Sequence, residues 1–245
     1  MRHPQADRFP ELCPFGMDGF LVRFALGFSE QANRAARDFG AEAARLPGVC
    51  EVVPALASVQ IRLDLAQVDR AQGAAALRGL IRERDWLDRA EVRAQRCWHL
   101  PISFDGDDAP GLAQAAAKTG LGEAAAVAQI LDARPRILAI GFAPGQPYLG
   151  LLPRPWDFPR RDSLADVPAG ALTVAIRQLV LFANPSPTGW LQIARTAFRP
   201  FQPEADDPMP LRPGDMIRFH RISAAERLTL AESGDMGGAR LEYLT

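Results

Sequence analysis

The sequence is poor in the side chains that perform most enzyme chemistry. It contains three cysteines, three histidines and a single lysine, Lys118, among its 28 basic residues. An odd number of scattered cysteines does not make a disulfide framework. Lys118 follows a run of alanines rather than the G-x-x-x-x-G-K-[ST] pattern of a phosphate-binding loop. The shortage of these side chains therefore argues against disulfide-stabilised folds and against nucleotide binding through a lysine loop.

Excess charge of one sign and long apolar runs are also lacking. The 28 basic residues balance 29 acidic ones, for a net charge of −1, so we expect no nucleic-acid partner. The most apolar stretches, Ile137–Ala143 and Ala171–Ala183, fall short of the roughly 20 residues that cross a membrane. Residues 1–19 contain no apolar core typical of a signal peptide. We therefore expect a cytoplasmic protein without a membrane partner.

The first third of the chain has the pattern of a compact α/β domain. Phe20, Val22 and Phe24 alternate with other residues, as in a strand with one apolar face. Ser29 is a suitable N-cap for a helix over Glu30–Leu46. The β-α-β-β-α-β order is ferredoxin-like, and we predict this domain over residues 1–97. The remaining predicted elements are strands at Val49–Val53, Val59–Leu63 and Val92–Ile102 and a second helix at Val68–Arg84.

The rest of the chain, residues 98–245, is predicted to form a second domain of a different kind. Two alanine-rich helical segments come first, at Pro110–Lys118 and Glu123–Leu131. After Arg136 the helical period disappears, and short apolar runs separated by proline and glycine favour an irregular barrel or sandwich. The whole chain is therefore of the α+β class. The apolar runs are Ile137–Phe142, Ala171–Ile176, Leu179–Phe182, Trp190–Ala194 and Met216–Phe219.

The few reactive residues have plain structural interpretations. Cys97-x-His99 is the one close Cys/His pair, and because two further ligands at usable spacing are missing, we predict no metal site. His220 lies at the end of a predicted strand and is interpreted as an exposed or edge histidine. The acidic pairs Asp107-Asp108 and Asp206-Asp207 are interpreted as solvated turn residues.

Three segments are candidates for binding an anion or an amide. Gly141–Gly150 has three glycines and two prolines directly after an apolar run. Such a stiff loop either presents backbone N–H groups to a ligand or forms a tight barrel corner. Arg160-Arg161 is either an anion clamp or a solvated pair. Arg195 either faces a cavity or holds a loop in place.

A set of short motifs follows a fixed order in the second domain, and one further motif lies in the first domain, so that the set covers about residues 18–221. The motifs are Gly48-Val49-x-Glu51-Val52-Val53-Pro54, Gly141-Phe142-Ala143-Pro144-Gly145, Pro147-Tyr148-Leu149-Gly150, Pro159-Arg160-Arg161, Val167-Pro168-Ala169-Gly170, Ser186-Pro187, Gly189-Trp190, Arg195-Thr196 and Leu211-x-Pro213-Gly214-Asp215-x-Ile217-Arg218-Phe219. Together they resemble the family of the 5-oxoprolinase B subunit, also called allophanate hydrolase subunit 1 or KipI-like proteins.

The resemblance implies a small α/β domain followed by a cyclophilin-like β-barrel of the carboxyltransferase type. It also implies a hetero-oligomer with a homologue of subunit 2, also called the C subunit, and with a third component, the 5-oxoprolinase A subunit. Such a complex uses ATP to hydrolyse C–N amide bonds, as in the conversion of 5-oxoproline to glutamate or in allophanate hydrolysis. The alternative is a non-catalytic, KipI-like protein that inhibits a histidine kinase. The chain has no Met-Lys-Met motif for biotin attachment.

The sequence departs from the family pattern at its most polar motif. The family's Ala-Gly-Asn-Gln-Thr-Gly-Ile-Tyr-Pro is replaced by Ala175–Ala183, which keeps Gln178 but has Ile176 and Val180 in place of the glycines. We expect these replacements to forbid positive φ angles and to fill space that a ligand would use.

The resemblance and the loop chemistry together define the predicted site. The Gly141–Gly150 loop would supply backbone donors to an oxyanion, arginines would hold a carboxylate or phosphate, and Gln178 would orient a small amide or lactam acid. Gln178 and Arg195 are the candidates for a catalytic role. The predicted substrate-binding residues are Gly141, Pro144, Gly145, Tyr148, Arg160, Arg161, Gln178, Trp190 and Arg195.

Overall fold

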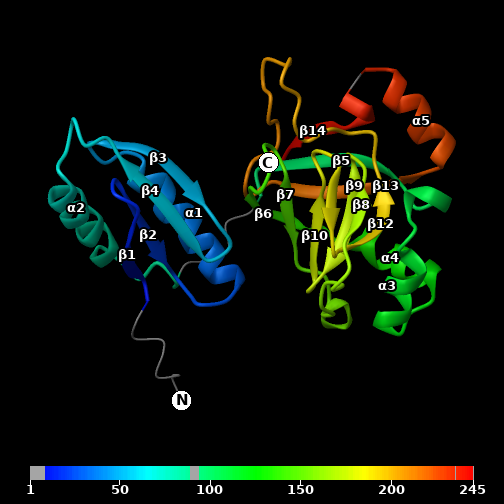
Figure 1. The fold of residues 1–245 in the computed structure, drawn as a ribbon, viewed down its shortest axis with the longest axis horizontal. Coiled ribbons are helices and arrows are strands. Elements are labelled where there is room, and N and C mark those ends of the chain that lie inside the picture. Colours follow the sequence, from blue (N-terminus) through cyan, green and yellow to red (C-terminus); the bar gives the residue numbers. More distant parts are fainter. Residues whose placement is uncertain (1–8, 89–93, 235, 245) are drawn as a thin grey trace. The chain divides into compact units, whose positions relative to one another are not determined.

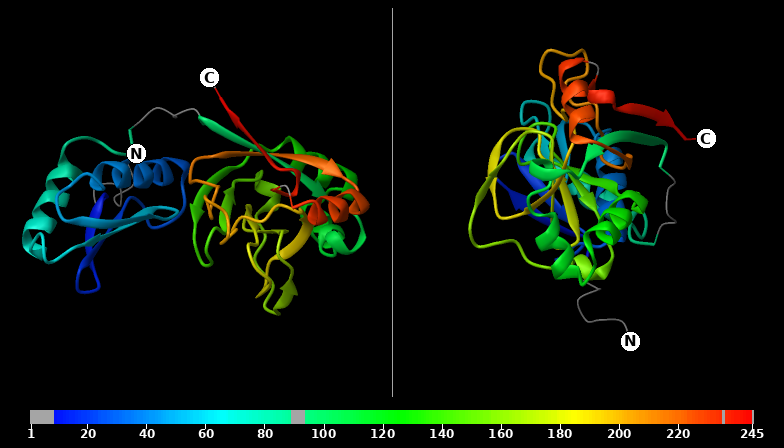
Figure 2. Two further views of the ribbon diagram at one scale, coloured as in Figure 1. Left: turned by 90° about the horizontal axis from the view of Figure 1, so that it is seen from above. Right: turned by 90° about the vertical axis from the view of Figure 1, so that its right-hand side faces the viewer.

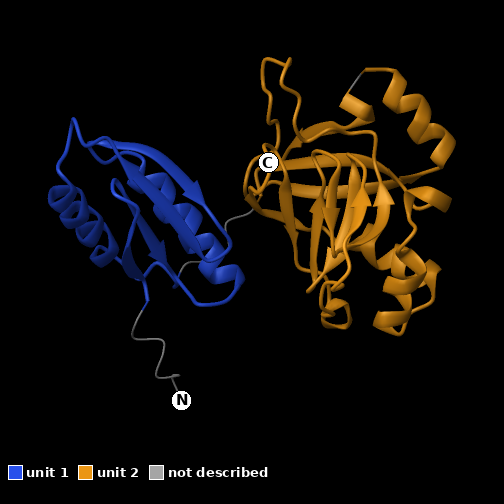
Figure 3. Ribbon diagram, viewed as in Figure 1, with its two compact units in different colours: residues 1–92 blue, residues 93–245 orange. Residues whose placement is uncertain are grey.

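The computed structural model describes residues 9–88, 94–234 and 236–244. His3 and the start of the strand predicted at Val92–Ile102 lie outside these ranges. The chain forms two compact units, residues 1–92 and 93–245, so the boundary predicted between 97 and 98 falls inside a strand of unit 2 (Figures 1 and 3). Within the described ranges, no helix has both the length and the apolar character needed to cross a lipid bilayer.

Unit 1 is an antiparallel sheet whose apolar face shares one core with two helices. Phe20 and Val22 lie opposite Ile61 and Val59, and all four side chains are buried in the same cluster as residues of both helices. The Ser29 hydroxyl accepts the Ala32 N–H in the first turn of α1, as predicted for an N-cap. The strand order is β1-β2-β4-β3. The elements are β1 (Glu11–Phe15), β2 (Gly19–Arg23), α1 (Glu30–Ala43), β3 (Val49–Pro54), β4 (Ser58–Leu63) and α2 (Arg70–Arg82).

The strand predicted at the end of unit 1 belongs to the sheet of unit 2 instead, so this prediction is wrong. Residues Arg96–Ser103 form β5, which belongs to the barrel of unit 2. The edge position beside β2 is occupied instead by β1, which forms a hairpin with β2. Alternating apolar residues predict a strand correctly, but they carry no information on which sheet buries its apolar face.

Unit 2 is a closed seven-stranded barrel, which confirms the predicted α+β class and barrel. Its strand order is β12-β9-β10-β7-β6-β13-β5, the ring is closed by pairing between β12 and β5, and β14 is added to β5 outside the ring. The elements are β5 (Arg96–Ser103), η2 (Gly106–Asp108), α3 (Leu112–Thr119), α4 (Glu123–Asp132), β6 (Arg136–Ile140), β7 (Pro147–Gly150), η3 (Arg154–Trp156), β8 (Ala165–Val167), β9 (Ala171–Ala175), β10 (Gln178–Leu181), β11 (Ser186–Thr188), β12 (Leu191–Arg195), β13 (Met216–Ile222), α5 (Ala224–Glu232), η4 (Met236–Gly238) and β14 (Arg240–Tyr243).

Strand β5 joins distant parts of the sequence of unit 2. It runs parallel to β13 over Cys97–Ser103 and antiparallel to β14, the C-terminal strand shown in red in Figure 2. Trp98, Leu100 and Ile102 face the barrel core. The indole N–H of Trp98 donates to the buried carboxylate of Asp215 at 3.1 Å, which holds the segment just before β13 against β5.

The hairpin between β9 and β10 contradicts one expectation. Ile176 and Arg177 both have positive φ angles, of 46° and 63°, although a β-branched residue was expected to forbid them. A two-residue hairpin loop requires this conformation to match the twist of its strands. The loop is held there because the N–H groups of Ile176 and Arg177 donate to the carbonyls of Phe158 and Trp156 at 2.8 and 3.0 Å.

The strained turn leads to a stability prediction. Ile176→Gly removes the steric cost of a left-handed β-branched residue, so the free energy of unfolding in urea should rise by about 1 kcal/mol. Ile176→Val, which keeps the branched side chain, should change it little. A lower free energy of unfolding for Ile176→Gly would show that this turn stores no strain.

Candidate functional site

Four adjacent barrel strands bring several predicted site residues to one outward face. Register places Tyr148 of β7 opposite Val180 of β10, and Val180 opposite Thr173 of β9. Gln178 lies opposite Ala175, two residues along β9 on the same face. The neighbouring residues Leu172 and Val174 point into the barrel core. This outward face is covered by a small apolar cluster formed by Val167, Ala171, Ala175, Val180, Phe182 and Trp190, against which Tyr148 packs.

Tyr148 is the polar centre of this face. Burial raises the pKa of its phenol above the ordinary value of tyrosine, while the Gln146 side chain and the nearby Arg160 guanidinium lower it in part. The Gln146 effect is that of an amide N–H close to the phenol oxygen, and Arg160 adds positive charge close to it. We call Tyr148, Gln146, Arg160, Arg161, Gln178 and Trp190 the Tyr148 cluster.

The arginine pair and the Gly-Trp motif meet beside this tyrosine. The Arg161 N–H donates to the Gly189 carbonyl at 2.7 Å, and the Arg161 guanidinium donates to the Trp190 carbonyl at 3.4 Å. A side chain at position 189 would collide with the Arg161 carbonyl, which explains the need for glycine there. Arg160 is exposed, so the two arginines differ: one fixes the loop and the other is open to solvent.

Two buried polar atoms of this cluster have no hydrogen-bond partner among the described residues. They are the amide oxygen of Gln146, whose side chain is 1% exposed, and Nε of Arg161. Gln178 of the same cluster is 4% exposed. Buried polar groups are nearly always paired with protein, water or ligand. The cluster therefore has unused capacity to accept and to donate hydrogen bonds.

The Gly141–Gly145 segment adjoins this cluster as a tight corner. The Gly141 N–H donates to the Gln146 carbonyl at 3.1 Å, and the Gln146 N–H donates to Ala143. Gly145 has a φ of 71°, and a Cβ there would clash with the Pro200 carbonyl. Pro144 is exposed at the tip. Two of the backbone donors expected to face an oxyanion are thus used inside the loop.

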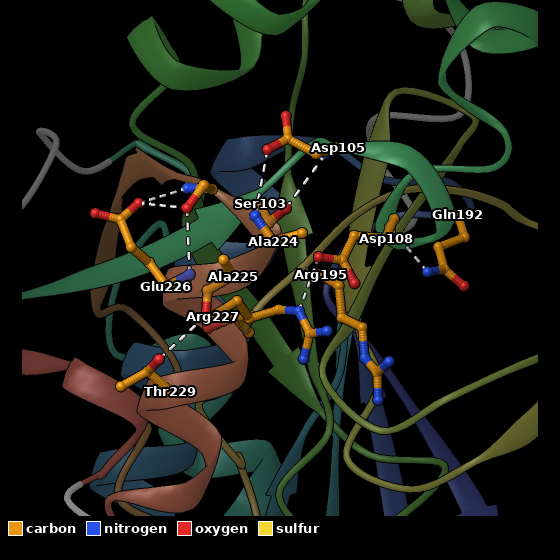
Figure 4. Close-up of polar contacts among 12 residues, drawn as sticks. Ser103, Asp105, Asp108, Gln192, Arg195, Ala224, Ala225, Glu226, Arg227 and Thr229 are labelled. Atoms are coloured by element: carbon orange, nitrogen blue, oxygen red, sulfur yellow. Dashed lines mark hydrogen bonds and ion pairs between the residues drawn. The ribbon is translucent and has the colours of Figure 1, made fainter.

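The other end of the same face holds a buried ion pair (Figure 4). The Nε of Arg227 on α5 donates to the carboxylate of Asp108 at 2.8 Å, and the two side chains are 8% and 4% exposed. Gln192 of β12 donates to the Asp108 carbonyl at 2.9 Å. The Asp105 carboxylate accepts the Ala224 N–H at 3.2 Å. This network joins the start of α5 to the turn after β5.

Asp108 was expected to be a solvated turn residue, and that expectation is wrong. Asp107 beside it is exposed, and so are Asp206 and Asp207. The pairs look alike in sequence, and only the contact with Arg227, which lies 119 positions away, distinguishes Asp108. No local pattern signals such a long-range partner.

Arg195 belongs to this second end of the face. Burial lowers the pKa of its guanidinium, nearby Arg227 and Arg199 lower it further, and Asp108 raises it. Its Nε donates to the Ala169 carbonyl at 3.4 Å, and it forms no ion pair with a described carboxylate. Figure 4 shows the Arg195 and Arg227 side chains next to each other.

The two candidate catalytic residues are not brought together. Arg195 lies opposite Ala171 and Gln178 lies opposite Ala175, at the two ends of β9. These positions are four residue steps apart along β9, or about 13 Å, which exceeds the reach of one small amide substrate. Gln146 was not predicted as a site residue. Its burial follows from the tertiary structure, and the local sequence does not signal it.

Comparison with known proteins identifies the class. The model of the carboxyltransferase domain, subdomain C and D, matches residues 10–211. The chain is 32% identical to the B subunit of 5-oxoprolinase from Escherichia coli O157:H7 over 71% of its own length and 78% of that protein. It is 28% identical to the B subunit of 5-oxoprolinase from Bacillus subtilis (strain 168), covering 85% of this chain and 91% of that one.

A solved structure has the same architecture. The crystal structure of TTHA0988 superposes with a TM-score of 0.70 at 31% identity, covering 84% of this chain. This chain spans 40% of that longer chain. A small α/β unit followed by a closed barrel is thus the architecture of a carboxyltransferase-type protein. The chain belongs to the carboxyltransferase subdomain C and D family, among relatives of the 5-oxoprolinase B subunit.

The buried ion pair leads to a stability prediction. Arg227→Met should lower the free energy of unfolding by about 3–5 kcal/mol, because it leaves the Asp108 carboxylate buried without its partner. The matched control is Arg221→Met, which breaks an exposed pair with Asp105 and should cost about 1 kcal/mol or less. Urea unfolding compares the two, and equal losses would contradict the role assigned to Arg227.

The raised pKa of Tyr148 leads to a second prediction. The chain has two tyrosines, so in Tyr243→Phe the phenolate absorbance reports Tyr148 alone. Its ionisation midpoint should lie above the ordinary value of about 10. Because the unfolded chain then loses the proton first, stability should fall as the pH rises above that value. Arg160→Gln should raise the midpoint further, whereas Arg154→Gln should not; a midpoint at or below the ordinary value would contradict burial as the dominant cause.

Proposed function

We propose that this chain is one component of an ATP-dependent amidohydrolase complex resembling 5-oxoprolinase. Membership of the carboxyltransferase subdomain C and D family supports this proposal. So do the relatives named as the B subunit of 5-oxoprolinase, a name that describes one member of a larger assembly. The substrate in this proposal is a small amide or lactam that carries a carboxylate, and its binding site is the Tyr148 cluster.

The observation that carries the substrate assignment is the unused hydrogen-bonding capacity of the cluster. The unpaired amide oxygen of Gln146 is an acceptor suited to the N–H of an amide or lactam. The Arg160 guanidinium, exposed beside Tyr148, is suited to a carboxylate, which it can bind through two parallel hydrogen bonds. A lactam acid such as 5-oxoproline presents both groups on one small ring.

The other predicted residues have supporting roles in this proposal. Gln178 orients the amide from the neighbouring strand, Trp190 forms an apolar wall, and Arg161 holds the loop that presents Arg160. Gly141, Pro144 and Gly145 shape the corner from which Gln146 and Tyr148 extend. Arg195 is left out of the substrate site, because it lies at the opposite end of β9 beside Arg227.

The proposal assigns ATP to the complex rather than to this chain. The sequence has no G-x-x-x-x-G-K-[ST] loop. Its one lysine, Lys118, holds its ammonium 5.8 Å from the centre of the Phe158 ring, an arrangement suited to a structural cation–π contact. The proposed partners are homologues of the C subunit (subunit 2) and of the A subunit of 5-oxoprolinase. The longer chain of TTHA0988 is compatible with a second part joined to this one.

The proposal is tested with a reconstituted complex of this chain and the C and A homologues from the same organism. ATP-dependent formation of glutamate from 5-oxoproline is the expected activity. Arg160→Gln and Gln146→Leu should raise the KM for 5-oxoproline, by about 10- to 100-fold for the charged contact. Arg154→Gln replaces an exposed arginine of η3 and serves as the matched control, with unchanged KM.

The outcomes separate the two levels of the proposal. An active complex whose KM is unchanged in both variants refutes the Tyr148 cluster as the substrate site but keeps the place of this chain in the complex. An inactive complex, together with recovery of a histidine kinase rather than the C homologue on purification from the native host, refutes the enzyme assignment and supports the regulatory alternative.

A further inference from the structure

The three strands β13, β5 and β14 place a second group of reactive side chains on the outside of the barrel. Register puts Cys97 of β5 directly opposite Glu242 of β14, and His99 opposite Arg240. Trp98, between them, points into the core, so Cys97 and His99 share the opposite face of β5. In the sheet order, β13 and β6 separate this strand from β7, which carries Tyr148.

Three of these residues offer metal-binding atoms close together. Cys97 Sγ, a ring nitrogen of His99 and a carboxylate oxygen of Glu242 all lie within 4.8 Å of one another. His99 Nε2 is 2.7 Å from Glu242 Oε2. A thiolate, an imidazole and a carboxylate are the three ligand types that zinc and similar divalent metals use.

Cys97 is buried beside the polar residues of the outer face of β5. Its exposed fraction is 3%, yet it is absent from the apolar clusters that the described residues of unit 2 form. Its side chain lies instead on the face of β5 that carries His99 and, on the paired strand, Glu242. The thiol therefore lies where it can act as a ligand together with the imidazole and the carboxylate.

We propose that Cys97, His99 and Glu242 form a binding site for a divalent transition metal of the zinc type. Three protein ligands leave one tetrahedral position for water or for a further ligand. This site lies outside the Tyr148 cluster and does not depend on the function proposed above.

His220 of β13 completes the site as an orienting residue. Its Nε2 is 2.7 Å from His99 Nδ1, and the two rings are stacked with centroids 5.0 Å apart. When His99 carries its proton on Nδ1 and donates it in a hydrogen bond to His220 Nε2, the lone pair on His99 Nε2 is free to bind the metal. A hydrogen bond to the second ring nitrogen is the usual way in which proteins orient a metal-binding histidine.

The charge balance fits a divalent ion. Binding releases the thiol proton of Cys97, because the metal binds the thiolate. The thiolate and the carboxylate together neutralise the ion. Arg218 and Arg240, which lie beside Glu242, disfavour any surplus positive charge and so favour this neutral composition.

The test uses the full chain without a polyhistidine tag and cobalt(II) as a visible probe. The expected result is one cobalt per chain with thiolate-to-cobalt charge-transfer absorption, displaced by zinc. Cys97→Ser should abolish the absorption, and Glu242→Gln and His99→Gln should weaken binding. His220→Phe should weaken it by about 10- to 100-fold. Cys13→Ser and Cys50→Ser are the matched controls and should keep the signal.

The substitution of Glu242 keeps the test decisive if Cys97→Ser fails to fold. The Glu242 side chain is 51% exposed, so Glu242→Gln leaves the core intact, and circular dichroism checks the fold of each variant. Absence of charge-transfer absorption in the unmodified chain overturns the proposal. So does absorption that survives in folded Cys97→Ser, or cobalt affinity unchanged in Glu242→Gln.

Discussion

The architecture of unit 2 depends on the hydrogen-bond pairing of one strand, β5. It pairs with β13 along seven residues, with β14 on its other side, and with β12 at the point where the barrel closes. Closure removes the unpaired edges that an open sheet would expose. The same pairing places Cys97 and His99 against the C-terminal strand. It also directs the chain after Ser103 toward α5, where Asp108 meets Arg227.

The outward face of strands β12, β9, β10 and β7 combines two kinds of polar environment. At one end the polar groups are satisfied: Gln192 and Arg227 both bond to Asp108, which fixes a helix to the barrel. At the other end, around Tyr148, buried polar atoms keep unused capacity. A satisfied buried network stabilises a fold, whereas unused capacity is costly unless something binds to it. This contrast separates the structural end of the face from the end proposed to bind substrate.

Local sequence information predicted the elements well and their partners poorly. The helix after Ser29, the alanine-rich helices and the short barrel strands follow from capping, period and turn residues, which act over a few positions. The ordered motifs also identified the family. The sheet to which β5 belongs, the burial of Asp108 and the positive φ angle of Ile176 were predicted wrongly. In each case a distant carbonyl, side chain or strand overrides the local preference.

The scarcity of cysteine, histidine and lysine, the balanced charge and the two kinds of hydrophobic pattern are properties of the sequence by itself. Together with the ordered motifs, they determined the α+β class, the barrel and the family. Tertiary structure alone decided that Gln178 and Arg195 lie at opposite ends of one strand. It also decided that two scattered histidines, a cysteine and a C-terminal glutamate meet on one face. The physical reason is that a side-chain cluster depends on strand register across the closed barrel, and register is fixed by burial and hydrogen bonding between segments that are far apart in the chain.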